Sequence, residues 1–118
     1  MITLYGIKNC DTVKKARKWL DASGIEHQFH DFREDGLDAD AVSSWLDELG
    51  WEQMVNKRSA SWKQLDQKTR DTMDSPLAQK AIIEHPTLIK RPLLDIGHQR
   101  FTGFSDKTYQ VIFNQHTL

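Results

Sequence analysis

Cys10, the only cysteine in the chain, is the residue best suited to covalent chemistry. It lies in a polar turn between a short apolar run and a stretch with the spacing of an amphipathic helix. The free N–H groups and the positive dipole end of a helix stabilise an ionised sulfur, so a nucleophilic thiolate is expected there. A buried, inert thiol is the alternative, because cysteine is among the residues most often buried. The polar neighbours of Cys10 favour the functional interpretation. They are Lys8, Asn9, Asp11 and Thr12.

A single cysteine cannot form an internal disulfide, so any redox cycle at Cys10 needs a thiol from outside the chain as its resolving partner. The same fact favours a protein of the reducing cytoplasm. The histidines have no ligand spacing and no cysteine partners, so no metal site is predicted. They are His27, His30, His85, His98 and His116.

Length and charge narrow the class of protein. A chain of 118 residues is expected to form one domain, spanning 1–118, and to be a monomer. Its net charge of −1 argues against a primary nucleic-acid binder. No apolar run approaches membrane-spanning length, and the start of the sequence lacks the pattern of a secretory signal.

The first part of the chain has the pattern of a strand–helix–strand unit. Residues 1–5 are expected to form a buried strand, residues 11–22 a helix, and residues 25–32 a second strand. The helix should bury Val13, Ala16 and Leu20. Its other faces carry four basic side chains, interpreted as a solvated surface: Lys14, Lys15, Arg17 and Lys18. This order implies two parallel strands joined by a right-handed crossover.

The residues after the second expected strand show several helical patterns in succession. One helix should begin at a cap, Asp38 or Asp40, and end at Gly50. Ser75 followed by Pro76 predicts another helix start, with serine as the cap. Roughly residues 36–86 are therefore interpreted as an inserted helical subdomain.

The last part predicts two strands and a helix. Residues 87–96 and 100–102 have strand character and flank a hairpin turn. Ser105 is expected to cap the final helix, with Phe104 packed on Tyr109. A βαβ half and a ββα half around a helical insertion predict an α/β, thioredoxin-like fold with a mixed four-stranded sheet. In that fold, redox cysteines occupy the position of Cys10.

Three segments resemble the arsenate reductase (ArsC) family: Tyr5-Gly-Ile-Lys-Asn-Cys-Asp-Thr12, Arg58 in a polar stretch, and Arg91-Pro92. The sequence is most similar to the branch that contains YffB-type proteins and the Spx/MgsR regulators. The resemblance covers essentially the whole chain in the order of its elements. It implies the thioredoxin-like fold with a helical insertion and thiol chemistry at Cys10.

The resemblance also implies residue roles. In ArsC-type reductases the cysteine attacks the oxyanion, glutathione resolves the intermediate, and arginines hold the anion. Arg58 and Arg91 match two of those arginines, and the planar guanidinium suits such a role because it pairs with two oxygens at once. Arg58 could equally be a solvated loop arginine. Pro92 is a candidate cis-proline.

Two departures from the family pattern bear on function. The family's third arginine should fall near Gly103, so arsenate itself is in doubt as the substrate. The Cys-x-x-Cys switch of many Spx regulators is absent, because Val13 follows three residues after Cys10. Lys8 is expected to add positive charge near the sulfur, and Thr12 to donate it a hydrogen bond.

Two functions follow as hypotheses. The first is a glutathione-dependent thiol or oxyanion reductase with no bound cofactor, in which Cys10 is the nucleophile and Arg58 and Arg91 bind the anion or glutathione. The second is an Spx-like transcriptional regulator that binds the RNA polymerase alpha subunit.

Overall fold

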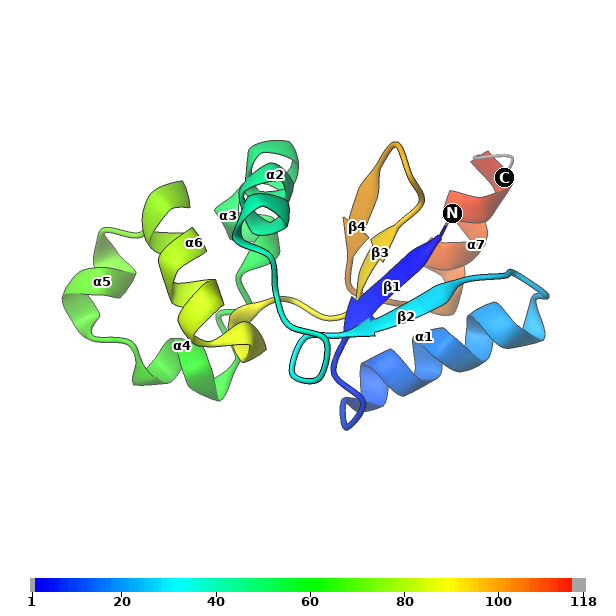
Figure 1. Cartoon of the computed structure of the whole chain (residues 1–118), viewed down its shortest axis with the longest axis horizontal. Helices are drawn as coiled ribbons and strands as arrows, with labels where there is room; N and C mark the ends of the chain where they lie inside the picture. The colour runs from blue at the N-terminus through cyan, green and yellow to red at the C-terminus, as the bar shows by residue number, and fades with distance from the viewer. Residues whose placement is uncertain (1, 116–118) are drawn as a thin grey trace. The chain divides into compact units, whose positions relative to one another are not determined.

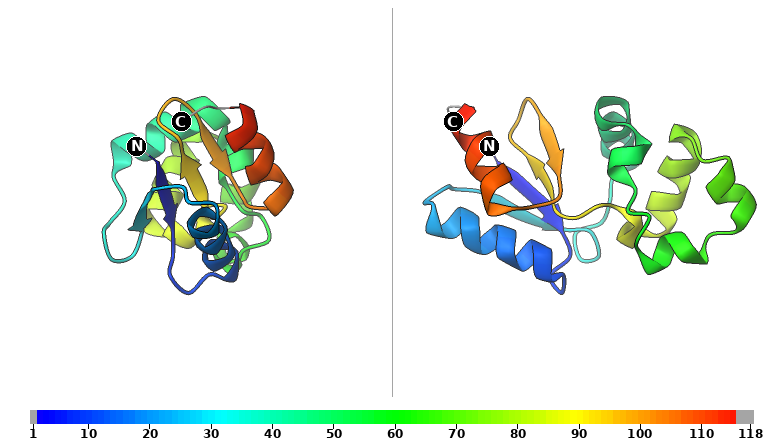
Figure 2. Two further views of the ribbon diagram at one scale, coloured as in Figure 1. Left: turned by 90° about the vertical axis from the view of Figure 1, so that its right-hand side faces the viewer. Right: turned by 180° about the vertical axis from the view of Figure 1, so that it is seen from behind.

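The computed structural model describes residues 2–115, and the chain divides into two compact units. The sheet unit comprises Met1–Asp31 with Arg91–Leu118, and the helical unit comprises Phe32–Lys90. Figures 1 and 2 show all the labelled strands in the first unit and a succession of short helices in the second. The insertion expected from the sequence, roughly 36–86, falls within the helical unit. No helix among residues 2–115 is both long enough and apolar enough to cross a membrane.

The sheet unit has a four-stranded sheet in the order β2-β1-β3-β4. Its strands are β1 (Thr3–Gly6), β2 (Gln28–Asp31), β3 (Leu93–Asp95) and β4 (Arg100–Thr102). β1 is parallel to β2 and antiparallel to β3, which is antiparallel to β4. Helix α1 (Asp11–Ala22) joins β1 to β2, and α7 (Asp106–Gln115) follows β4. The predicted α/β, thioredoxin-like fold with a mixed four-stranded sheet is confirmed.

One row of apolar side chains crosses the whole sheet. The strand registers pair Leu4 with Phe29 and with Leu94, and Leu94 with Phe101. Because side chains alternate between the faces of a strand, these four lie on the same face. Leu4 and Leu94 are completely buried and belong to one core with Leu20 of α1. The apolar face of the sheet therefore sets where α1 must pack.

Helix α7 packs beside α1 through aromatic rings. Tyr109 is completely buried, and its ring meets those of Trp19 and Phe104 edge-on at centroid distances of 5.6 and 4.7 Å. Ser105 Oγ accepts the Thr108 N–H at 3.0 Å, so Ser105 caps the helix as expected. The Tyr109 hydroxyl is buried and has no hydrogen-bond partner within residues 2–115.

Tyr109→Phe is expected to raise the free energy of unfolding by about 1–2 kcal/mol, because it removes a buried polar group that has no partner while keeping the ring contacts. Urea denaturation of the two proteins at neutral pH measures the difference. Phe113→Leu, at a half-buried ring stacked on Trp19, is the control for loss of aromatic packing and should destabilise. A less stable Tyr109→Phe would show that the hydroxyl has a stabilising partner.

The same substitution should change how stability depends on pH. Burial raises the pKa of Tyr109 well above its usual value of 10. Above about pH 10 the unfolded chain loses this proton while the folded chain keeps it, so stability falls as pH rises, by up to about 1.4 kcal/mol per pH unit. Tyr109→Phe should therefore lose less stability between about pH 9 and pH 11 than the unsubstituted chain does. Tyr5, whose pKa is raised by burial and by Asp95, contributes equally to both proteins.

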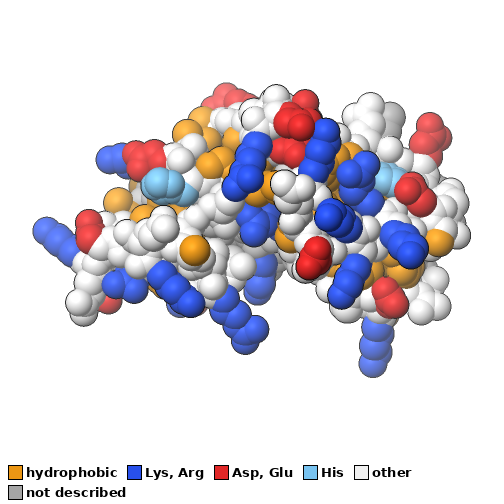
Figure 3. Space-filling view, turned by 90° about the horizontal axis from the view of Figure 1, so that it is seen from below, with side chains coloured by type: hydrophobic (Ala, Val, Ile, Leu, Met, Phe, Trp, Pro, Cys, Tyr) orange, Lys and Arg blue, Asp and Glu red, His pale blue; other side chains and the backbone are white. Residues whose placement is uncertain are grey.

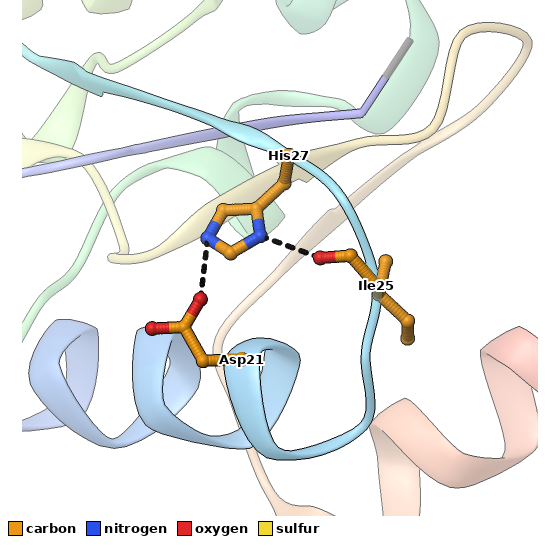
Figure 4. Close-up of polar contacts among 3 residues, drawn as sticks. All are labelled: Asp21, Ile25 and His27. Carbon is orange, nitrogen blue, oxygen red and sulfur yellow. Dashed lines mark hydrogen bonds and ion pairs between the residues drawn. The ribbon is translucent and has the colours of Figure 1, made fainter.

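The connection from α1 to β2 is held by a histidine, which Figure 4 shows in detail. His27 Nδ1 donates to the carbonyl oxygen of Ile25 at 2.9 Å, and Nε2 lies 3.9 Å from Asp21 Oδ1. These contacts join the last turn of α1 to the residues that lead into β2. The role visible for His27 is structural.

The helical unit consists of short helices, most of which have a side-chain cap at the N-terminus. They are α2 (Ala39–Leu49), α3 (Trp51–Met54), α4 (Ala60–Gln64), α5 (Gln67–Asp71) and α6 (Ser75–Glu84), followed by the 3-10 turn η1 (Pro86–Leu88). At the starts of α2, α4, α5 and α6, a side-chain oxygen of the N-cap residue accepts a backbone N–H group of the first turn. These N-cap residues are Asp38, Ser59, Asp66 and Asp74. The core of the unit forms where α2 packs on α6.

Two expectations for local structure are wrong in detail. The strand predicted over 87–96 is reduced to Leu93–Asp95, because Pro92 has no N–H to donate to a sheet and Ile89 pairs with Val55 inside the helical unit. The cap of α6 is Asp74 rather than Ser75, since Asp74 Oδ1 accepts the Leu77 N–H at 2.9 Å.

Candidate active site at Cys10

Cys10 is the N-cap residue of α1, directly after the loop that leaves β1. Its backbone is extended, with φ −96° and ψ 123°, and its side chain is half-buried. The Cys10 N–H donates to the Ile7 carbonyl at 3.2 Å, and the Cys10 carbonyl accepts the Lys14 N–H at 3.0 Å. The thiol therefore stands at the start of a 12-residue helix, where backbone N–H groups have no partner within the helix.

The sheet register brings four connections of the sheet unit to one end of the sheet. Gly6 pairs with Asp31, so the loop to Cys10 leaves β1 where β2 ends. Tyr5 pairs with Leu93 in antiparallel register, so Arg91 and Pro92 enter β3 at this end. Leu93 pairs with Thr102, so the residues that follow β4 leave from the same place. The topology therefore brings Cys10, Lys8, Arg91 and Pro92 to one end of the sheet.

Two hydrogen bonds hold these connections together. Asp31, only 3% exposed, accepts the Lys8 N–H through Oδ2 at 3.0 Å. Gly103 donates its N–H to the Pro92 carbonyl at 2.9 Å. The Arg91–Pro92 peptide bond is cis. The loop before Cys10 is thus attached to β2, and the segment after β4 to the Arg91–Pro92 turn.

Asp31 is a site residue that sequence reasoning missed. It follows Phe29 by two positions and so lies on the apolar face of the sheet, where a carboxylate is unusual. A charged residue at a core-facing position is the feature of the sequence that could have identified Asp31. The carboxylate orients the backbone of the loop that carries the thiol.

The remaining predicted site residues fall in both units. Lys8 is exposed, Thr12 is half-buried in the first turn of α1, and Arg91 is half-buried. All three belong to the sheet unit with Cys10 and Pro92. Arg58 belongs to the helical unit. Its role in the same site as Cys10 is part of the function proposed below.

Arg58 lies on a well-fixed turn of the helical unit. Its N–H donates to Asn56 Oδ1 at 3.0 Å, and its exposed side chain lines a cavity of about 470 Å³ with Lys57 and Lys90. The backbone of Asn56 is held in turn by the Leu88 carbonyl, at 2.8 Å. This arrangement presents three positive charges and the negative charge of Glu52 at one cavity.

Two tryptophans support the same turn. The rings of Trp51 and Trp62 are nearly parallel, at 12° and 6.4 Å between centroids. Lys57 Nζ lies 5.1 Å from the first centroid and 5.8 Å from the second, within range of cation–π attraction to both. The rings therefore pack around the basic turn.

Gly103 lies where the family resemblance places a third arginine. Its φ is +82°, a backbone conformation that glycine adopts freely and that costs other residues about 1–2 kcal/mol. An arginine at this position would be strained. Within residues 2–115, no group of three His, Cys, Asp or Glu side chains gathers in a way that could hold a metal ion.

Comparison with known proteins places these features in a family. The ArsC family model matches residues 5–112. The solved structure of the YffB (PA3664) protein superimposes with a TM-score of 0.89 at 35% identity, covering 94% of this chain and 97% of that one. An arsenate reductase (ArsC) related protein from Brucella melitensis is 38% identical, with a TM-score of 0.79 and coverage of 95% and 93%.

Two proteins with similar sequences show that the similarity extends to proteins of different kinds. An uncharacterized protein of Haemophilus influenzae is 48% identical over 96% of this chain and 99% of its own length. The global transcriptional regulator Spx of Streptococcus pyogenes is 29% identical over 90% of this chain and 80% of its own. Taken with the match over residues 5–112, the thiol at the start of α1 and the mixed sheet behind it, these similarities mean that the chain belongs to the ArsC family.

Proposed function

We propose that the protein is a glutathione-dependent thiol reductase that uses Cys10 as its single nucleophile. The observation that carries the proposal is the position of the chain's only cysteine, half-buried at the N-cap of α1, where free N–H groups and the helix dipole favour a thiolate. Membership of a family named for a thiol-dependent reductase agrees with this chemistry. A cytoplasmic location, where glutathione is abundant and thiols stay reduced, belongs to the same proposal.

The reaction proceeds by two exchanges on one sulfur. The Cys10 thiolate attacks the glutathione sulfur of a mixed disulfide, the S–S bond breaks, and the substrate's sulfur leaves as a thiolate. A glutathione thiolate then attacks the Cys10–glutathione disulfide, which releases glutathione disulfide and restores the Cys10 thiolate. The proton lost by glutathione passes through solvent to the substrate's sulfur. The net change is a mixed disulfide plus glutathione giving a thiol plus glutathione disulfide, so atoms and electrons balance.

Positively charged side chains are assigned to the binding of glutathione, because its carboxylates need positively charged partners. Arg91 and Lys8 reach the end of the sheet where Cys10 lies, and a guanidinium can hold a carboxylate through two parallel hydrogen bonds. Thr12, in the first turn of α1, is assigned to hydrogen bonding near the sulfur. Arg58 is assigned the same anion-binding role from the helical unit, by its match to the family pattern. The absence of the family's third arginine, at whose expected place Gly103 lies, supports thiols rather than arsenate as substrates.

Turnover of a glutathionylated peptide, followed through glutathione reductase and NADPH, tests this function. Arg91→Ala should raise the KM for glutathione by roughly tenfold, the equivalent of one lost charge-assisted hydrogen bond, while Arg91→Lys should raise it less. Arg58→Ala should act in the same direction. Lys68→Ala, at an exposed lysine of α5, is the matched control and should leave the KM within twofold.

The proposal fails if the unsubstituted protein turns over no mixed disulfide with glutathione. The same assay with arsenate in place of the disulfide separates the two reductase chemistries. Faster turnover of arsenate than of the disulfide would establish the oxyanion reaction instead.

A regulatory function is the second candidate, and the similarity to Spx carries it. In this case the protein would bind the RNA polymerase alpha subunit without turning over a substrate. A pull-down with the C-terminal domain of that subunit tests the idea. Absence of binding, together with intact reductase turnover, excludes it.

A further inference from the structure

A groove lies along the outer side of the sheet unit, between α1 and the start of α7. Its volume is about 620 Å³, and its lining includes Thr12, Lys15, Lys18 and Trp19 from α1. Phe104 and Asp106 line it from the other side. Of these residues only Thr12 has a part in the reductase chemistry proposed above.

The floor of the groove is aromatic and firmly supported. Trp19 stacks on Phe113 at 5.7 Å and meets Tyr109 edge-on, and Phe104 also meets Tyr109 edge-on. Trp19 and Phe104 are nevertheless only half-buried, so part of each ring remains available at the groove. A ligand with an apolar side chain could cover those rings without rearranging the core.

The α1 wall of the groove is positively charged. Lys15 and Lys18 are exposed and three residues apart, so they lie on one face of α1 and repel each other weakly. Neither ammonium has an ion-pair partner in the part of the chain that the structure describes. Figure 3 shows, on the face it draws, more Lys and Arg side chains than acidic ones. Asp106 on the other side of the groove carries one negative charge, so the two lysines leave the lining net positive. An acidic ligand would pair with Lys15 and Lys18 and relieve their repulsion.

The shape of the groove favours a peptide over a small molecule. Small-ligand sites enclose most of the ligand surface, whereas much of this lining is itself exposed to solvent. An extended peptide can lie along such a groove and place alternate side chains in it. Thr12, which lines the groove, is two residues from Cys10 along α1.

We propose that this groove binds an acidic polypeptide segment, with an apolar side chain against Trp19 and Phe104 and carboxylates at Lys15 and Lys18. The inference deepens the proposed function and rests on it, because the bound segment belongs to the protein whose mixed disulfide reacts with Cys10. The groove thereby selects acidic protein substrates next to the nucleophile.

An NMR titration of the isotope-labelled Cys10→Ser protein tests binding without thiol chemistry. The probes are three acetylated and amidated peptides: Glu-Glu-Leu-Glu-Glu, Glu-Glu-Ser-Glu-Glu and Lys-Lys-Leu-Lys-Lys. The first should shift the indole N–H signal of Trp19 and leave those of Trp45, Trp51 and Trp62 in place. The serine peptide should bind more weakly, and the lysine peptide should not bind.

Charge reversal supplies the matched pair of variants. Lys15→Glu/Lys18→Glu in the same background should weaken binding of the acidic leucine peptide by at least about tenfold, since two attractions become repulsions. Lys63→Glu/Lys68→Glu, at exposed lysines of the helical unit, should leave it within twofold. Far-UV circular dichroism and urea unfolding confirm that both variants fold.

The outcomes separate this inference from the reductase proposal. Equal binding to the Lys15→Glu/Lys18→Glu variant, an unmoved Trp19 indole, or the same shifts with glutathione alone would overturn the groove assignment. Peptide binding in a protein that turns over no mixed disulfide would refute the reductase and leave the groove as a binding site. Turnover without peptide binding would refute the groove alone.

Discussion

Replacing Cys10 with serine is expected to abolish turnover of mixed disulfides with glutathione. A serine hydroxyl does not attack a disulfide at neutral pH, and the chain contains no second cysteine that could take over. Serine differs from cysteine only in its smaller γ atom, and Cys10 is only half-buried, so the free energy of unfolding should change by less than about 1 kcal/mol. Loss of activity with unchanged stability therefore isolates the chemistry.

Mass spectrometry gives a second, independent readout of the same substitution. After exposure to glutathione disulfide, the unsubstituted protein should carry one glutathione in disulfide linkage at Cys10, and Cys10→Ser should carry none. Because the intermediate is covalent, initial rates should also show the ping-pong pattern of a two-step exchange. Residual turnover in Cys10→Ser, or a ternary-complex pattern in the unsubstituted protein, contradicts the proposed reaction.

Gly6→Ala is expected to destabilise the protein by about 1–3 kcal/mol, the range for overpacking a close-packed core. A Cβ at residue 6 would lie 2.7 Å from Val13 Cγ2 and 3.1 Å from Cγ1. Val13 is completely buried, and its branched side chain has one strongly preferred rotamer in a helix, so it has little freedom to move aside. The strain must therefore displace α1 relative to β1.

This displacement should also affect the site, because Gly6 precedes the loop that leads to Cys10. A shift of about 1 Å in a reacting group can cost as much as a hundredfold in rate. We therefore expect turnover per folded molecule to fall in Gly6→Ala. Urea denaturation and the mixed-disulfide assay on the same preparation separate the loss of stability from the loss of rate.

Val13→Ala provides the control for the steric explanation. By itself it leaves a cavity and destabilises the protein. Combined with Gly6→Ala, it removes the two methyl groups that the new Cβ would meet, so the double variant should be about 1 kcal/mol or more less destabilised than the sum of the single variants. Additive losses would show that the cost of Gly6→Ala comes from another source.

Local pattern was enough to place Cys10 directly before a helix and to give the order of elements. The spacing of Val13, Ala16 and Leu20 has the period of one helix face, and Cys10 directly precedes that helix. The order of strands and helices, with the ArsC-like segments, was enough for the mixed sheet. The helix face and the place of Cys10 depend on neighbours along the chain, which is why local pattern determined them, whereas the pairing of β1 with β3 joins distant residues and was expected only from the order of elements and the family resemblance.

The tertiary structure decided the features that depend on distant residues. The role of Asp31 appears only because a strand 23 residues further along the chain brings its carboxylate to the Lys8 N–H. The predicted strand 87–96 is divided because Ile89 finds its partner at Val55. The groove exists because α1 and α7, separated by most of the chain, pack on the same aromatic core. The position of Cys10 before the first helix was thus predictable, whereas what surrounds it required the assembled sheet.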